Sequence, residues 1–532
     1  MQTDAKHHTT RWQLIFVFYI IPKNIGFCNS FAVLIFTTTV DIINVSNKRR
    51  GTVDLIRKVF KETPSGWATN PIERKSYYAF FLGQNAIYAL VTSYLTTYFM
   101  LIGVDLTKAT GIMLAIKIWD AVNDCLFGVI FDMVKFKSGK KYLPWLRMSL
   151  VLITVTTVLM FAAPFRSSST TKLVWFAISY LIWDSVYTLC DVPIYGIITS
   201  MTKNIAERNA MMSYKSIWGG AGSTVTTVVV TVLISEKVGS NYTVVALVVA
   251  IIAFITMLPS CLKLEERYTP PQEDESFTVR GMFSYLFKNK YLLIFYIGFF
   301  FYSSVNIAGA LNLWVSFYLF NNTLFSLVVG ALGVAPSIIL SLLTPKILTK
   351  IDKMKLFKLS TLLTIILSVI MWLVGYKSIA AFAILSTLRS IPQAIFGVVL
   401  FMFTPDCAEY GRYKTGIDAK GITFAIQTFM CKLTGAISGS VSLLWMGLEY
   451  TGWITVEAEN FEQLQELNVQ QSPHALNVLW FVYVMVPAIG YLCSYLVWML
   501  YKLNDKDVQI MADCNAGKIT REEAENQLSR KY

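Results

Sequence analysis

Acidic side chains inside apolar segments are the first residues of this sequence that could do chemistry. Asp120 and Asp124 are four residues apart, which stacks both carboxylates on one helix face, and Lys117 lies one turn before Asp120 on that face. Two close carboxylates can bind a hard cation or share a proton. An internal Lys–Asp pair that only tightens packing is the structural alternative. A charge in the hydrocarbon region costs about 2.5–3.5 kcal/mol, which favours a functional interpretation.

A third acid, Asp191, lies in the middle of another apolar segment. Thr188 is three residues before it and Tyr195 four residues after it, so an acceptor and an aromatic ring share one face. An acid that accepts hydroxyl protons beside a ring that covers the apolar sugar face is typical of polyol recognition. For Asp184, in the same segment, a bond to a neighbouring helix is the simpler interpretation.

Two lysines are further candidates for the membrane interior. Lys432 is the only charged residue between Lys420 and Glu449, and Thr428 lies one turn before it. A cation at that depth can balance the acids when no substrate cation is bound. Lys215 lies at the end of its apolar segment, where a snorkelling side chain and a substrate contact are both reasonable.

The elements that must position these residues are membrane helices. The chain has 532 residues, of which 55% are hydrophobic and 15% charged, against about 25% charged in soluble domains. Long apolar runs without alternation predict an all-α polytopic membrane protein. We expect twelve transmembrane segments: 76–101, 110–131, 143–163, 172–199, 215–235, 241–262, 290–319, 324–345, 355–375, 378–404, 420–447 and 474–502.

Loop charge predicts the orientation of these segments. Lysines and arginines crowd the loops that follow the second, eighth and tenth segments, whereas the loop at 449–472 is acidic. We therefore expect both ends of the twelve-helix unit to be cytoplasmic, in the cell (plasma) membrane. The net charge of +13 belongs to these loops and gives no indication of nucleic-acid binding.

The most polar interior stretch divides the segments six and six, which predicts two six-helix halves of the major facilitator type. We expect an N-terminal extension that is weakly structured or interfacial, an N-terminal half, a cytoplasmic linker, a C-terminal half and a cytoplasmic tail. Their predicted bounds are 1–75, 76–262, 263–289, 290–502 and 503–532.

Other function classes have little support in the sequence. The eight cysteines are scattered and there are three histidines, without a metal-ligand spacing, so we expect neither a structural metal nor a catalytic constellation. A channel or receptor would need a continuous polar pore or a large external domain, and the loop at 449–472 is too short for such a domain. We therefore expect no enzyme activity and no cofactor apart from a coupling ion.

At these residues the chain resembles the glycoside–pentoside–hexuronide:cation symporters of the major facilitator superfamily. The resemblance covers residues 76–505. It is carried by the motif Ile118–Asp124, by the loop that contains Gly128, Asp132, Gly139 and Lys140, and by the stretch Tyr187–Tyr195. The stretch that contains Asp406, Glu409 and Arg412, which resembles the loop after the tenth helix, and the segment Gln427–Lys432 complete it.

The resemblance implies roles for individual residues. Asp120, Asp124 and Thr188 would bind the coupling cation, with Lys117 as a charge partner. Asp191, Tyr195, Asn85, Lys215, Thr428 and Lys432 would contact the sugar. Gly128, Asp132, Gly139, Lys140, Asp406, Glu409 and Arg412 would form gating motifs at the cytoplasmic side. Asn85 stands where some members carry a charged pair, and Tyr195 stands where some carry Trp.

These observations predict a secondary active transporter that moves a sugar or glycoside together with Na⁺ or H⁺ by alternating access. An uncoupled sugar facilitator on the same fold is the alternative. The expected partners are a small sugar, a monovalent cation and the lipid bilayer, and we expect a monomer.

Overall fold

The computed structural model describes residues 66–134, 136–268, 279–400, 402–416 and 420–532. The chain divides into two compact units, Met1–Ile72 and Glu73–Tyr532, and almost all described residues belong to the second. The predicted extension at 1–75 falls mostly on residues 1–65, outside the described residues. The described part has helices and one isolated bridge as its regular structure.

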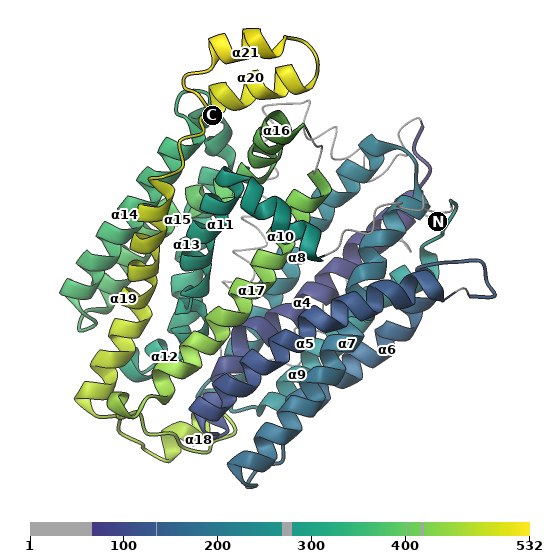
Figure 1. Cartoon of the computed structure of the whole chain (residues 1–532). Helices are drawn as coiled ribbons and strands as arrows, with labels where there is room; N and C mark the ends of the chain where they lie inside the picture. The colour runs from purple at the N-terminus through teal and green to yellow at the C-terminus, as the bar shows by residue number, and fades with distance from the viewer. Residues whose placement is uncertain (1–65, 135, 269–278, 401, 417–419) are drawn as a thin grey trace, which may run out of the picture. The chain divides into compact units, whose positions relative to one another are not determined.

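Among the described residues, six long helices precede the central linker (Figure 1). Asp105 and Ser168 cap the second and fourth of them by accepting main-chain N–H groups, as expected of N-cap residues. Their bounds are α4 Pro71–Leu101, α5 Leu106–Met133, α6 Leu143–Met160, α7 Ser169–Met201, α8 Ile205–Ile234 and α9 Tyr242–Lys263.

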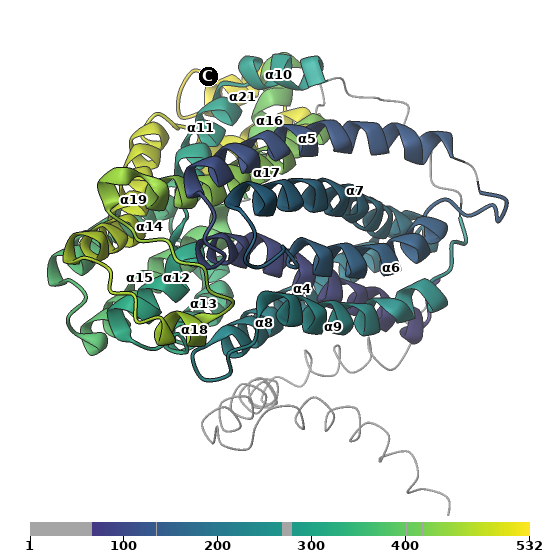
Figure 2. The same cartoon turned by 90° about the horizontal axis from the view of Figure 1, so that it is seen from below.

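The rest of the chain adds a second group of long helices and several short ones (Figure 2). The bounds of the long group are α11 Lys290–Ser304, α12 Ala308–Phe320, α13 Phe325–Leu348, α14 Lys353–Val374, α15 Ile379–Leu400, α16 Phe403–Thr415, α17 Lys420–Gly447 and α19 Pro473–Trp498. The short helices are α10 Val279–Lys288, η2 Glu449–Thr451, α18 Phe461–Glu466, α20 Asp505–Asn515 and α21 Arg521–Gln527.

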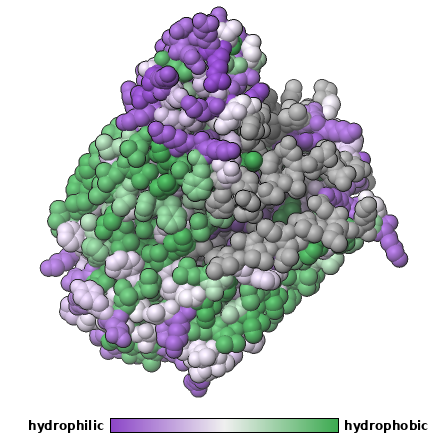
Figure 3. Space-filling model, viewed as in Figure 1, coloured by the Kyte–Doolittle hydropathy of each residue, from purple (hydrophilic) through white to green (hydrophobic). Residues whose placement is uncertain are grey.

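Nine helical stretches among the described residues are long and apolar enough to cross a membrane. Hydrophobic side chains cover a broad band of the face seen in Figure 3, and hydrophilic side chains gather over the α20–α21 end. A lipid-facing surface has this distribution, because lipid tails cannot hydrate polar groups. The fold is therefore an all-α polytopic membrane fold.

Two predicted segments differ from the helices observed. The stretch 290–319 is two helices, α11 and α12, that meet in a turn where the amide of Asn306 bonds the carbonyl of Ser303. The stretch 405–420 was predicted as a loop, but most of it belongs to the helix α16, Phe403–Thr415. The helix dipole favours an acid near the helix start and a base near the helix end. Asp406 and Arg412 occupy these positions and so stabilise a helix whose sequence is polar.

Aromatic side chains hold the second group of helices together. Phe357 on α14 stacks on Phe396 of α15 with ring centroids 4.2 Å apart, and Trp498 of α19 lies 4.6 Å from the Phe357 ring. Burying such rings is among the larger favourable contributions to packing. This core makes a rigid support for the helices that face the cavity described next.

Candidate functional site

A cavity of about 860 Å³ lies between the two groups of long helices. Its lining comes from α4, α5 and α7 on one side and from α11, α12 and α17 on the other. Seven of the predicted site residues line it: Asn85, Asp120, Thr188, Asp191, Tyr195, Thr428 and Lys432. Residues far apart in the sequence therefore meet at one concave site.

The helix face around Asp191 is held by a neighbour that the sequence analysis did not single out. Gln84 on α4 is 2% exposed, and its amide donates a 2.6 Å hydrogen bond to the Asp191 carboxylate. Pro193 on α7 cannot donate an N–H, so the carbonyl of Leu189 is left without its usual helical partner. The side chain of Asp191 is thus oriented from α4 at the wall of the cavity.

An amide on α5 connects that helix to α7. Asn123 is 1% exposed and donates to the Thr188 hydroxyl at 2.9 Å and to Asp184 at 3.4 Å. The Ser185 hydroxyl donates to the side-chain carbonyl oxygen of Asn123 at 3.2 Å. This confirms the interpretation of Asp184 as a residue that bonds a neighbouring helix. The same carboxylate also lines the cavity, beside Asp120 and Thr188.

Aromatic rings form much of the α4–α7 wall. Trp183 stacks on Tyr187 with ring centroids 5.0 Å apart, and Tyr88 of α4 lies 5.6 Å from Tyr187. The opposite wall consists largely of small side chains, among them Gly309, Gly435 and Gly439. The cavity therefore has one aromatic, acidic wall and one wall rich in small residues, which also carries Lys432.

Lys215 and two predicted residues of α5 stand apart from this set. The Lys215 ammonium lies 3.7 Å from the centroid of the Tyr195 ring and 4.8 Å from that of Phe81, so it reaches the site through Tyr195. Lys117 and Asp124 lie on the same helix as Asp120, but their side chains are outside the described ones.

The predicted gating residues of α16 are not among the residues that line the cavity. The Lys353 ammonium pairs with Asp406 at 2.6 Å and with Asp505 at 3.3 Å, and Asn515 donates to the Glu409 carboxylate at 2.9 Å. Arg412 lies in the last turn of α16. These contacts join α14 and α16 to α20, so the tail is docked on the helical bundle.

The predicted loop between α5 and α6 has an anchor of its own. The Glu266 carboxylate accepts the amides of Lys141, Tyr142 and Leu143 at 2.8, 2.9 and 2.6 Å. Gly139 has a φ of +68°, a conformation that favours glycine, and Lys140 follows it. Gly128 and Asp132 lie in the last turns of α5, and the Asp132 side chain is outside the described ones.

Comparison with known proteins decides the family. A family model described as "MFS/sugar transport protein" matches residues 76–505. The chain belongs to this family of major facilitator sugar transporters. This confirms the predicted resemblance to glycoside–pentoside–hexuronide:cation symporters, and it makes the protein a membrane transporter rather than an enzyme.

Curated relatives of the family match most of the chain. It is 25% identical over 454 residues to the isoprimeverose transporter of Lactiplantibacillus pentosus, covering 83% of this chain and 90% of that protein. It is 22% identical over 436 residues to a glucuronide carrier protein homolog of Escherichia coli (strain K12), covering 80% and 91%. A candidate glycoside/cation symporter of the same strain, YagG, is 21% identical over 429 residues, covering 79% and 90%.

Solved structures share the fold. The nucleoside transporter NupG has a TM-score of 0.56 at 14% identity, covering 81% of this chain and 100% of NupG. A bacterial homolog of the human lysosomal transporter Spinster has a TM-score of 0.58 at 11% identity, covering 82% and 98%. In both cases the likeness extends over nearly the whole length of the solved chain, which shows a shared fold.

Proposed function

We propose that this protein is a secondary active symporter that carries a sugar or glycoside together with Na⁺ or H⁺. The observation that carries the proposal is the cavity itself, which brings Asp120, Thr188, Asp191 and Lys432 to one site between the two groups of helices. Relatives described as sugar transporters and as a glycoside/cation symporter support the same assignment.

The coupling cation would bind at the α5–α7 side of the cavity. Asp120 and Asp124 supply negative charge and oxygen ligands, and the Thr188 hydroxyl adds a neutral ligand. Asn123 holds Thr188 at 2.9 Å and so fixes the distance between α5 and α7. A bound cation would neutralise these acids, whose charge is costly in a membrane interior when no cation is present.

The sugar would bind against the aromatic wall. Asp191, oriented by Gln84, accepts hydroxyl protons, and Tyr195 offers its ring to an apolar sugar face. Asn85 on α4, with Thr428 and Lys432 on α17, supplies further polar groups. Lys215 would act on the sugar through the Tyr195 ring that it contacts.

The membrane topology would comprise twelve crossings. Six would come from α4 to α9 and six from α11–α12, α13, α14, α15–α16, α17 and α19, joined by the linker at 263–289 and followed by the tail at 503–532. The basic loops favour a cytoplasmic position for the linker and for the tail. The two halves would then rock around the cavity, so that it opens to one side at a time.

Ligand-dependent thermal stabilisation tests this proposal. The purified protein in detergent is heated with each member of a panel of monosaccharides, disaccharides and glycosides, with and without Na⁺ and at several pH values. We expect at least one sugar to raise the melting temperature, and to raise it further with the coupling ion, because a ligand that binds only the folded state stabilises it. Stabilisation by sugar that no ion alters would favour the uncoupled facilitator, and an unaltered melting temperature across the panel would contradict the sugar site.

A further inference from the structure

One loop of the second helix group reaches across to the first group at one end of the bundle. This strap, residues 448–472 between α17 and α19, contains the bridge partner of Ile102, and its Ala458 amide donates to the Leu101 carbonyl at 2.8 Å. Gly103 has a φ of +68°, and a Cβ there would lie 3.2 Å from Glu457. A side chain at position 103 would therefore press against Glu457, so the backbones of the strap and of the α4–α5 loop are closely packed.

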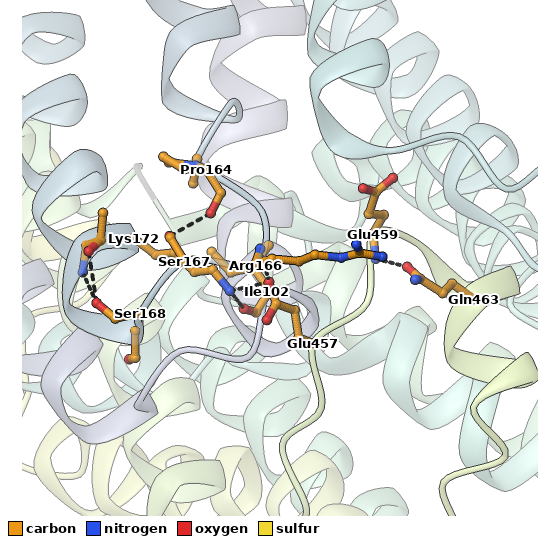
Figure 4. Close-up of polar contacts among 12 residues, drawn as sticks. Ile102, Pro164, Arg166, Ser167, Ser168, Lys172, Glu457, Glu459 and Gln463 are labelled. Atoms are coloured by element: carbon orange, nitrogen blue, oxygen red, sulfur yellow. Dashed lines mark hydrogen bonds and ion pairs between the residues drawn. The ribbon is translucent and has the colours of Figure 1, made fainter.

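An ion pair between a buried lysine and a half-buried glutamate holds the strap in place (Figure 4). Lys172 on α7 is 2% exposed, and its ammonium donates to Glu457 Oε1 at 2.5 Å and to the Ile102 carbonyl at 2.8 Å. The Arg166 amide donates to the same carboxylate oxygen at 2.6 Å. Burial raises the pKa of Glu457, but the hydrogen bonds from Lys172 and Arg166 outweigh it and lower that pKa, so Glu457 stays ionised at neutral pH.

Two further contacts join the same groups of helices at this end. The Asn460 amide on the strap donates to the Gly239 carbonyl, in the loop between α8 and α9, at 2.6 Å. Glu236 of that loop accepts from Thr323, between α12 and α13. At the opposite end, strong ion pairs lie within one group, such as Arg267 with Glu73 at 2.9 Å.

We propose that the Lys172–Glu457 pair is the lock that holds the transporter closed at the end where the strap lies. Under the proposed topology this is the outer end, so the inference rests on alternating access. When the halves separate at this end, Lys172 loses Glu457, which is the only acid that pairs with its ammonium among the described residues. An ammonium deprived of its partner while still buried is strongly unfavourable. The lock therefore favours the closed state until the separating halves admit water to Lys172.

Distance measurement between spin labels tests the lock without sugar or coupling ion, so its result does not depend on the substrate. Genetically encoded labels replace Thr170 on α7 and Lys377 between α14 and α15, two exposed positions at this end that lie on opposite halves. The variants are Glu457→Gln and, as a second way to break the pair, Lys172→Met. Glu466→Gln is the matched control, because it removes one negative charge from an exposed position of the same strap.

We expect both lock variants to increase the long-distance, open fraction at least about tenfold, because each loses a hydrogen bond between charged groups. The control should keep the distribution of the unaltered protein. The swapped double variant, Lys172→Glu with Glu457→Lys, should restore the short distance in part. A distribution that neither lock variant changes, in protein that elutes as a single folded species, would overturn the proposal. So would an equal shift in Glu466→Gln.

Discussion

The amide of Gln84 on α4 donates a 2.6 Å hydrogen bond to the carboxylate of Asp191 on α7. This contact ties the first helix of the bundle to the acid that faces the cavity, and Gln84 is almost fully buried. A buried amide held on a carboxylate fixes the direction in which the remaining lone pairs point. The sugar-binding side of the site is therefore shaped by a residue that lies behind it.

Replacing Gln84 by Ala should weaken sugar binding more than it weakens folding. A hydrogen bond to a charged group contributes about 1.5–3 kcal/mol, so the Kd for sugar should rise at least about tenfold. Trp183 lines the cavity, and its fluorescence during a sugar titration can report binding. Gln465→Ala, an exposed glutamine on α18, is the control. Equal affinity in Gln84→Ala and in the control would show that Asp191 does not need its neighbour.

Asp120→Asn should separate sugar movement from ion coupling. The substitution keeps the size of the side chain and removes the charge that would attract a cation. Sugar exchange between the two sides of a vesicle should continue, because exchange at equal cation concentrations needs no net ion flow. Accumulation driven by a cation gradient should fall at least about tenfold, as expected when a charged ligand is lost. If Asp120→Asn accumulates sugar like the unaltered protein, Asp120 has no part in coupling.

Two glycines should respond differently to the same substitution. A Cβ on Gly222 of α8 would collide with the Leu82 carbonyl of α4, whereas a Cβ on Gly435 of α17 would meet nothing within 4 Å. Gly222→Ala should lower stability by about 1–3 kcal/mol through overpacking, and Gly435→Ala should change it little. Thermal melting of the two variants decides. Equal melting temperatures would contradict both the close α4–α8 approach and the open wall at Gly435.

Docking of the tail should weaken in acid. Burial raises the pKa of Asp507, but hydrogen bonds from Ser529, Tyr532 and Asn504 outweigh it and lower that pKa below its ordinary value of 3.8. A carboxyl with a lowered folded-state pKa stabilises the fold above its unfolded pKa, and this contribution is lost as the pH falls through the folded value. A spin label at Asn526 should therefore become mobile below about pH 4.

Asp507→Asn is the control for that experiment. It removes the charge that the hydrogen bonds from Asn504, Ser529 and Tyr532 favour, so the label should be mobile at neutral pH and show little further change in acid. A label in the unaltered protein that stays equally immobile from neutral pH down to about pH 2 would contradict a role for Asp507 in docking.

The family and seven of the residues that line the cavity could be predicted from the sequence. Charges inside apolar segments are conspicuous because lipid makes them costly, so Asp120, Asp191 and Lys432 stood out. Uncharged amides are cheaper to bury, so Gln84 and Asn123 did not stand out in their roles as hydrogen-bond donors. Recognising them needs the distance between helices, which periodicity along a single helix does not contain.

Contacts between loops far apart in the chain could not be predicted from the sequence either. Lys172 lies near the start of its helix, where a lysine is ordinarily expected to snorkel to the surface. Its ammonium is instead buried and pairs with Glu457, which is 285 positions later in the chain. The helical structure of residues 405–415 in α16 was missed for another reason. Its sequence is polar, and it is the position of Asp406 and Arg412 at opposite ends of the helix that stabilises it.

Sugar accumulation in vesicles tests the central claim most directly. Purified protein in vesicles is given radiolabelled sugar and an imposed inward gradient of Na⁺ or of protons, chosen from the ion that stabilises the sugar complex. Coupling predicts a transient interior sugar concentration above the exterior one, which collapses when an ionophore removes the gradient. Interior sugar that rises only to the exterior concentration, with either gradient and with or without ionophore, would contradict symport.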